Sequence, residues 1–258
     1  MPTSCNAGFY QSTTGQSSCV ACPIGNSCPV AALSSPIPCA AGTYQPNTAS
    51  VACLPCPPGD FCAAGSATPA DPLRLRYFAN LASGVSTINI TNTGQLGADS
   101  PAIESAAAVG AVCVNIYTFA PDQQLISCCS CPITPNGIVS LDVKKDLATN
   151  TLTPATETSL VVELLTSLPL PGPSGPTCNN SAAAPGTLAS GVEAWATTLH
   201  AAPAGGTFQA TETPFTRATL SASELAKMTG FCSLIQADGS GFGTCNSCTP
   251  GAFGAAKQ

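Results

Sequence analysis

Charged residues are scarce in this chain of 258 residues. Only 8% of the residues are Asp, Glu, Lys or Arg, whereas an average soluble domain has about 25%. The seven Lys and Arg residues are scattered and the net charge is −6, which argues against a nucleic-acid partner, because such binding needs clustered basic side chains. No stretch approaches the roughly 18 unbroken apolar residues that a membrane span needs.

Residues that commonly carry catalysis are also few. His200 is the only histidine, and it follows the stretch Trp195–Leu199 without a Gly-x-Ser-x-Gly context nearby. The 13 carboxylates lie along the chain with no apposed pair identifiable from spacing, so glycosidase chemistry is not indicated. We therefore expect no catalytic residue and no enzymatic activity, and we interpret His200 as a surface or edge residue.

Cysteine, in contrast, is abundant, and the first eight of the 16 cysteines recur at a fixed period. Four of the 16 cysteines recur 34 positions later as a second set of four: Cys5, Cys19, Cys22 and Cys28, then Cys39, Cys53, Cys56 and Cys62. Ala7-Gly8 and Tyr10-Gln11 also recur, as Ala41-Gly42 and Tyr44-Gln45. Similarity at a fixed period indicates tandem modules, and we expect one copy in residues 1–34 and another in residues 35–68.

Each copy has too few large apolar residues to close a core, so disulfides or a metal must hold it together. Cys19-x-x-Cys22 and Cys53-x-x-Cys56 have the spacing of a zinc ribbon. The even cysteine total and the single histidine favour disulfides over zinc. Within each copy we expect the bonds Cys5–Cys19 and Cys22–Cys28, and Cys39–Cys53 and Cys56–Cys62.

This region resembles the cysteine-rich repeats of ephrin-receptor-like and tumour-necrosis-factor-receptor-like proteins. The residues that match are Cys5-x-Ala7-Gly8-Phe9-Tyr10, Cys19-x-x-Cys22-Pro23-x-Gly25-x-x-Cys28 and the same series from Cys39 to Cys62. In those families the modules stack into a rod used for extracellular binding or spacing. The resemblance therefore implies an extracellular or cell-surface location and a protein or cell-surface ligand.

Residues 69–258 predict one β-rich domain with its own disulfides. Alternation of apolar and polar residues places Val139, Leu141 and Val143 inward, and Leu160, Val162, Leu164 and Leu168 on one face of another strand. Turns at Pro121-Asp122 and Thr134–Gly137 predict a three-stranded meander over 111–144. Further strands are expected near 73–79, 86–92, 190–200 and 207–220. The predicted fold is a mainly antiparallel β-sandwich.

One helix is expected near the end of this domain. Ser221-x-x-Glu224 has the pattern of a capping box, and it precedes apolar residues at helical spacing, namely Leu225, Met228, Phe231, Cys232 and Ile235. The domain also holds the other eight cysteines, which we expect to be disulfide-bonded: Cys113, Cys128, Cys129, Cys131, Cys178, Cys232, Cys245 and Cys248.

The strand pattern predicts on which face of a strand some of these cysteine side chains lie. Cys128 and Cys129 alternate faces in a strand, so they should bond in different directions. Cys113 is expected opposite Cys129–Cys131, where a cross-hairpin bond is feasible. Cys245-x-x-Cys248 lies in a Gly-rich segment without a βαβ pattern, so a structural role is favoured over a redox role.

Residues 110–258 also resemble secreted bacterial proteins of unknown role, of an acidobacterial type. The stretches that carry the resemblance are Ala111–Asp122, Ser127–Pro132, Leu220–Leu225, Gly239–Cys245 and Ala255–Gln258. The resemblance implies a bacterial exported protein and no particular activity. A disulfide-rich chain must be exported, and Met1–Cys5 contains no apolar signal segment, so we expect a removed signal or a different natural start.

We expect that no cofactor is required, and calcium is the metal that the oxygen ligands of two loops would suit. Asp238-Gly239-Ser240-Gly241 and the loop that holds Asp99 and Glu104 offer oxygen ligands, although neither fits an EF-hand. A solvated loop carboxylate is the alternative interpretation of each.

Three functions stay open. The first is a secreted structural protein that assembles with itself, head to tail, into a filament, tube or surface layer, because a chain so poor in charge lacks the usual protection against self-association. The second is a receptor-like or adhesive binding module, and the third and least favoured is a secreted enzyme.

Overall fold

The chain forms two compact units, Met1–Asp71 and Pro72–Gln258. The computed structural model describes residues 5–13, 18–57, 60–82, 84–96, 110–152, 157–172, 177–200, 209–245 and 249–250. The chain is mainly β, with a disulfide-rich first unit, antiparallel sheets and, among the described residues, one α-helix near the end of the second unit. The predicted fold class is therefore confirmed.

The first unit, here called the repeat unit, is built from short hairpins and disulfides. Its strands are two residues long and pair antiparallel as β1 (Phe9–Tyr10) with β2 (Val20–Ala21), β3 (Asn26–Ser27) with β4 (Ile37–Pro38), and β5 (Thr43–Tyr44) with β6 (Leu54–Pro55). The disulfides are Cys5–Cys19, Cys22–Cys28, Cys39–Cys53 and Cys56–Cys62, which are the expected pairs.

Backbone hydrogen bonds join the two copies of the repeat. The amide of Gly25 donates to the carbonyl of Gln45 at 2.8 Å, and the amide of Ala49 donates to the carbonyl of Cys22 at 2.8 Å. Gln45 is 5% exposed and its Nε2 donates to the carbonyl of Ala52. The buried apolar residues of this unit are all cysteines, among the residues that the structure describes. Covalent bonds and backbone pairing therefore hold the unit together in place of an aliphatic core.

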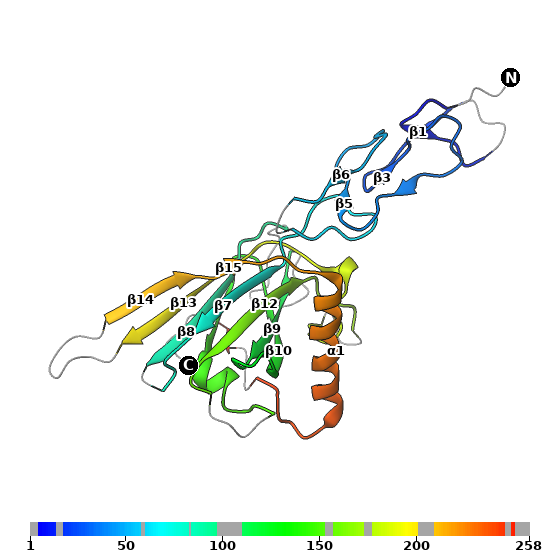
Figure 1. Cartoon of the computed structure of the whole chain (residues 1–258). Coiled ribbons are helices and arrows are strands. Elements are labelled where there is room, and N and C mark those ends of the chain that lie inside the picture. Colours follow the sequence, from blue (N-terminus) through cyan, green and yellow to red (C-terminus); the bar gives the residue numbers. More distant parts are fainter. Residues whose placement is uncertain are drawn as a thin grey trace. The chain divides into compact units, whose positions relative to one another are not determined.

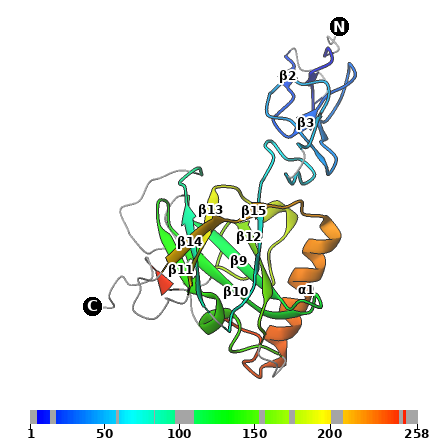
Figure 2. The same ribbon diagram turned by 60° about the vertical axis from the view of Figure 1, so that its left-hand side comes forward.

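The second unit, here called the sandwich unit, contains two five-stranded sheets (Figures 1 and 2). The first has the order β10 (Leu125–Ile133), β9 (Val112–Phe119), β12 (Leu160–Ser167), β7 (Leu73–Phe78), β15 (Thr216–Arg217). The second has the order β14 (Gln209–Pro214), β13 (Val192–His200), β8 (Val85–Asn92), β11 (Ile138–Asp142), β16 (Thr249–Pro250). Two short elements complete it, the π-helical turn η1 (Val143–Leu147) and the 3-10 turn η2 (Pro185–Thr187).

The core lies between the two sheets. Alternate residues of the central strands point into it, such as Val112, Val114 and Ile116 on β9 and Ile88 and Ile90 on β8. Fully burying one such aliphatic side chain stabilises the folded state by about 1.5–3 kcal/mol. The core therefore gives the sandwich unit a source of stability that the repeat unit lacks.

The predicted meander over 111–144 is wrong in its third strand. β9 and β10 form the expected hairpin, but β11 pairs with β8 in the other sheet. The turn between β10 and β11 is bound to the end of β8, because Asn92 Nδ2 donates to the carbonyl of Ile133 and the Asn136 amide donates to the carbonyl of Asn92. These bonds direct the chain across the core instead of back along β10.

Two residues expected on inward strand faces lie outside strands. Val143 is buried, but it begins η1, where the Asp142 side chain caps the turn by accepting from the amide of Lys145. Leu168 follows the end of β12 and is 42% exposed. The described helices include none long and apolar enough to cross a membrane.

Candidate functional site

The helix α1 (Ala222–Asp238) is fixed to the outer face of the first sheet (Figures 1 and 2). Its start is the predicted capping box, in which the Glu224 amide donates to Ser221 Oγ and the Ser221 amide donates to Glu224 Oε2. Leu225, Met228 and Ile235 are buried beneath it, and the disulfide Cys128–Cys232 ties it to β10. A helix held by both packing and a covalent bond provides a rigid wall for a neighbouring site.

Two further disulfides between described residues of this unit hold connecting segments to the same sheet. Cys129 bonds to Cys245 and Cys113 bonds to Cys178. The different directions expected for Cys128 and Cys129 are therefore confirmed.

The prediction of a cross-hairpin bond for Cys113 is wrong, because Cys113 bonds to Cys178. A register shift between Leu125 and Ser127 places Cys113 opposite Pro132. The neighbouring Cys131 is paired with Val114, and thus points to the opposite face of the sheet from Cys113.

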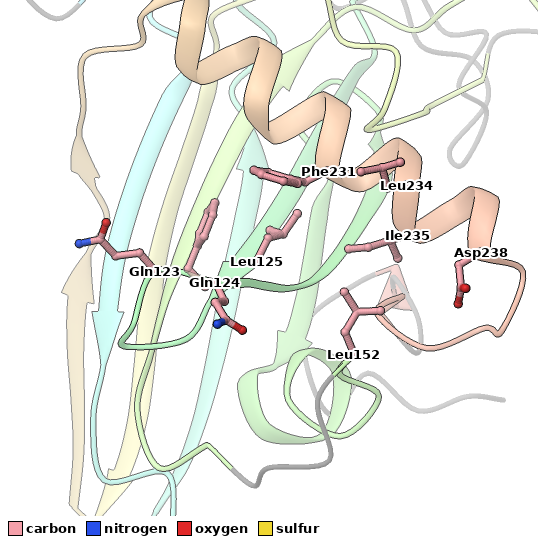
Figure 3. A pocket seen from close by; sticks show the side chains of 9 residues that line it. Gln123, Gln124, Leu125, Leu152, Phe231, Leu234, Ile235 and Asp238 are labelled. Carbon is pink, nitrogen blue, oxygen red and sulfur yellow. The ribbon is translucent and has the colours of Figure 1, made fainter.

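An apolar groove runs between α1 and the hairpin that joins β9 to β10 (Figure 3). It is about 470 Å³ in volume and is lined by Phe119, Gln123, Gln124, Leu125, Leu152, Phe231, Leu234, Ile235 and Asp238. Phe231 is 53% exposed and Leu234 is 67% exposed. Six of these nine side chains are apolar, as in sites that bind small molecules.

The segment that follows α1 supports the floor of the groove. Gly243 accepts through its carbonyl from the Cys128 amide, and its own amide donates to the carbonyl of Asn150. A Cβ on Gly243 would lie 2.8 Å from Cγ2 of Ile235 and 3.0 Å from Cγ of Leu152. The loop is therefore packed directly against two of the side chains that line the groove.

A polar cluster lies under the same helix, on the outer face of the sheet. Glu163 on β12 is paired across the ladder with Tyr117 on β9, whose hydroxyl donates to the carbonyl of Asn180 at 2.6 Å. Burial, with a smaller contribution from Glu224, raises the pKa of Glu163 to about 7. Burial and the Glu163 carboxylate also raise the pKa of Tyr117.

A second hollow of about 400 Å³ lies beside this cluster and is polar. Gln236 Nε2 donates to Asn180 Oδ1 at 2.6 Å, and Ser181 Oγ donates to Gln236 Oε1 at 2.8 Å. The polar side chains around this second hollow thus bind one another, whereas the apolar side chains of the groove face water. The groove is therefore the stronger candidate site.

The predicted metal ligands are not brought together in the described part of the chain. Asp238 lies at the end of α1 and lines the groove, while Asp99 and Glu104 lie outside the described residues. No group of three His, Cys, Asp or Glu side chains that could hold a metal occurs among the residues described. Calcium binding stays a prediction.

His200 and Cys131 are not among the side chains that line the groove. His200 ends β13, is exposed, and has Nε2 at 2.8 Å from Thr211 Oγ1. Cys131 is disulfide-bonded, and Cys248 lies outside the described residues. None of the cysteines that the structure describes is free.

Sequence reasoning places Phe231 on the buried side of the helix and does not single out Leu234. Both are exposed, because the buried stripe of α1 is narrow and contains Leu225, Met228, Cys232 and Ile235. One feature of the sequence could have indicated the exposed apolar residues: α1 carries more large apolar residues than one buried stripe of a helix needs.

Comparisons with known proteins match part of the chain. Residues 31–69 match the family described as tyrosine-protein kinase ephrin type A/B receptor-like. This agrees with the resemblance of the repeats, and with the disulfides it indicates an extracellular or surface location. A crystal structure titled Thermotoga maritima 1070 aligns with 57% of this chain and 97% of its own, at 11% identity and a TM-score of 0.32. No curated protein matches, and no match supports the bacterial resemblance of residues 110–258.

Proposed function

We propose that this protein is an extracellular binding protein whose sandwich unit holds a ligand in the groove beside α1. The observation that carries the proposal is the groove itself, in which Phe231 and Leu234 face water next to a helix fixed by Cys128–Cys232. Exposed apolar surface that is both concave and rigid is typical of binding sites. In this proposal the repeat unit is a spacer or a second binding surface, which its ephrin-receptor-like segment supports.

Nile red, a neutral dye that fluoresces in apolar surroundings, tests the groove. We expect the wild-type protein to enhance its fluorescence and the double variant Phe231→Ser with Leu234→Ser to bind it at least about tenfold more weakly, given the apolar area removed. Leu199→Ser is the matched control, since Leu199 is 40% exposed on β13 in the other sheet. Equal binding by both variants would contradict the proposal.

The proposed function includes no catalytic step. The one histidine lies exposed at a strand end with Thr211 Oγ1 as its hydrogen-bond neighbour, and no third described side chain bonds to its ring to orient it as a general base. A panel of ester, peptide and glycoside substrates is the practical screen. Turnover that is lost in a folded His200→Ala variant would show that the protein is an enzyme.

Self-assembly into a filament, tube or surface layer is the second candidate. The observation that favours it is β14, an edge strand of the second sheet in which five of six residues are exposed, because an open strand edge can pair with another chain. Sedimentation and electron microscopy at high protein concentration test this candidate. A stable monomer across salt, chelator and reductant would exclude it.

A further inference from the structure

The groove is apolar along its length and acidic at one end. Phe231, Ile235 and Asp238 follow one another down the side of α1 that faces the hairpin (Figure 3), because positions i, i+4 and i+7 share one face of a helix. Asp238 is the last residue of α1. A ligand that lies along the apolar stripe therefore meets the carboxylate at the end of the helix.

Three features make this end of the groove attractive to a cation. The Asp238 side chain is exposed and has no hydrogen bond or ion pair with any residue that the structure describes. The last turn of α1 carries no basic residue, and the helix ends at Gly239 with φ 68°. The carboxyl end of a helix carries a partial negative charge, which adds to that of Asp238.

Among the described residues, none of the other side chains that line the groove compensates this charge. Gln123 and Gln124 are neutral, the remaining six are apolar, and no Lys, Arg or His is among them. Gln124 follows Asp122 by two positions, and Asp122 Oδ1 accepts from the Gln124 amide at 3.1 Å, so the turn that borders the groove also carries a carboxylate. The electrostatic field in this part of the surface thus favours positive charge.

We infer that the ligand of the groove is a small amphipathic cation. Its apolar part occupies the space between Leu125, Phe231 and Ile235, and its ammonium or guanidinium group lies beside Asp238. The volume of about 470 Å³ is within the range of about 300–1,000 Å³ that small-molecule sites occupy. This inference rests on the proposed function, since it names the ligand class of the same groove.

Three probes with the same eight-carbon chain test the inference: octylammonium, octanol and octanoate. Binding to the full-length protein is measured by calorimetry and located by amide chemical-shift changes in α1 and the β9–β10 hairpin. We expect Asp238→Asn to weaken octylammonium by about two- to fivefold, the range for an exposed ion pair. The same variant should leave octanol unchanged and strengthen octanoate, and added salt should reduce the effect on octylammonium.

Glu212→Gln is the control, because it removes the same charge from an exposed position on β14 in the other sheet. It should leave all three affinities unchanged. If octanol binds in the groove but Asp238→Asn does not alter octylammonium, the inference is overturned and the groove remains a binding site. If octanol causes no shift changes in the groove, the proposed function fails as well.

Discussion

The repeat unit and the sandwich unit use disulfides for different purposes. In the repeat unit the bonds join cysteines 6 or 14 positions apart, and the strands are two residues long. In the sandwich unit the three disulfides between described residues have separations of 65, 104 and 116, and a large apolar core already exists. Short-range bonds thus replace a core, whereas long-range bonds attach a helix and loops to one.

Removing one disulfide from each unit should produce the largest difference. Loss of a native disulfide lowers the free energy of unfolding of a small domain by about 2–5 kcal/mol. Strands of two residues supply too little stability to compensate for this loss. We expect Cys22→Ala with Cys28→Ala to unfold the first repeat. Cys128→Ala with Cys232→Ala should loosen α1 and leave the sheets folded. Hydrogen exchange of the full chain, followed by mass spectrometry, measures both units at once.

The outcome that would contradict this comparison is protection of the first repeat in the Cys22 and Cys28 variant. It would show that the backbone bonds between copies, such as Gly25 to Gln45, hold the module without its covalent link. Loss of protection throughout β9 and β12 in the other variant would show that the core depends on the bond to α1.

Two glycines at equivalent repeat positions give the next largest effect. Gly8 and Gly42 have φ of 88° and 83°, so alanine at either is strained by about 1–2 kcal/mol. A Cβ on Gly8 would lie 2.5 Å from the carbonyl oxygen of Ala49 in the second copy, whereas one on Gly42 has nothing within 4 Å. We expect Gly8→Ala to destabilise the repeat unit more than Gly42→Ala, by a further 1–3 kcal/mol or so. Exchange free energies of repeat-unit amides measure the difference, and equal losses would mean that the copies are not tightly stacked.

The parts of the fold that local rules govern were predictable from the sequence. Alternation located β11 and β12, strands were also expected near the positions of β8, β9 and β13, and the capping box located the start of α1. The 34-residue period located the repeats and their disulfides. In each case the signal lies within a few residues of the element that it specifies.

The sheet to which a strand belongs and the location of the groove were not predictable in this way. β11 crosses to the second sheet because Asn92, more than 40 residues earlier in the chain, binds the preceding turn. The groove needs α1, the β9–β10 hairpin and Leu152 together, and Cys128–Cys232 spans 104 positions. Non-local contacts of this kind leave no periodic signal in the sequence. Asp238 was identified as a candidate ligand residue, but the apolar groove beside it was not.

A second pair of glycines tests packing at the groove. Gly241 and Gly243 have φ of 80° and 77°, and only Gly243 has close neighbours, Ile235 and Leu152. Alanine at Gly241 should cost about 1 kcal/mol from backbone strain alone. Gly243→Ala should cost about 1 kcal/mol more and should also weaken Nile red binding. The fluorescence of Trp195, the single tryptophan, reports urea unfolding of the sandwich unit, and identical midpoints for the two variants would contradict the packing described.

A further difference between the two units depends on pH. Among the residues described, the repeat unit buries no carboxylate, whereas Glu163 in the sandwich unit has a pKa of about 7 and a buried Oε2 without a hydrogen-bond partner. The unfolded chain loses this proton near pH 4.5, so between about pH 4.5 and 7 the folded state binds more protons than the unfolded state. Stability of the sandwich unit should therefore fall as pH rises through this window and level off above it.

Glu163→Gln should remove that decline. The variant cannot ionise, so we expect it to be more stable than the wild type at pH 8 by about 1–2 kcal/mol, a value reduced from the full pKa shift because the group is partly solvated. At pH 4.5 the two proteins should be nearly equal, since Glu163 is then largely neutral in both states. Urea unfolding followed by Trp195 fluorescence at pH 4.5, 6 and 8 measures this, with the exposed Glu212→Gln as control. A wild-type unit whose stability rises between pH 5 and 7, or a variant that tracks the wild type at every pH, would show that Glu163 is solvated and that α1 does not cover it.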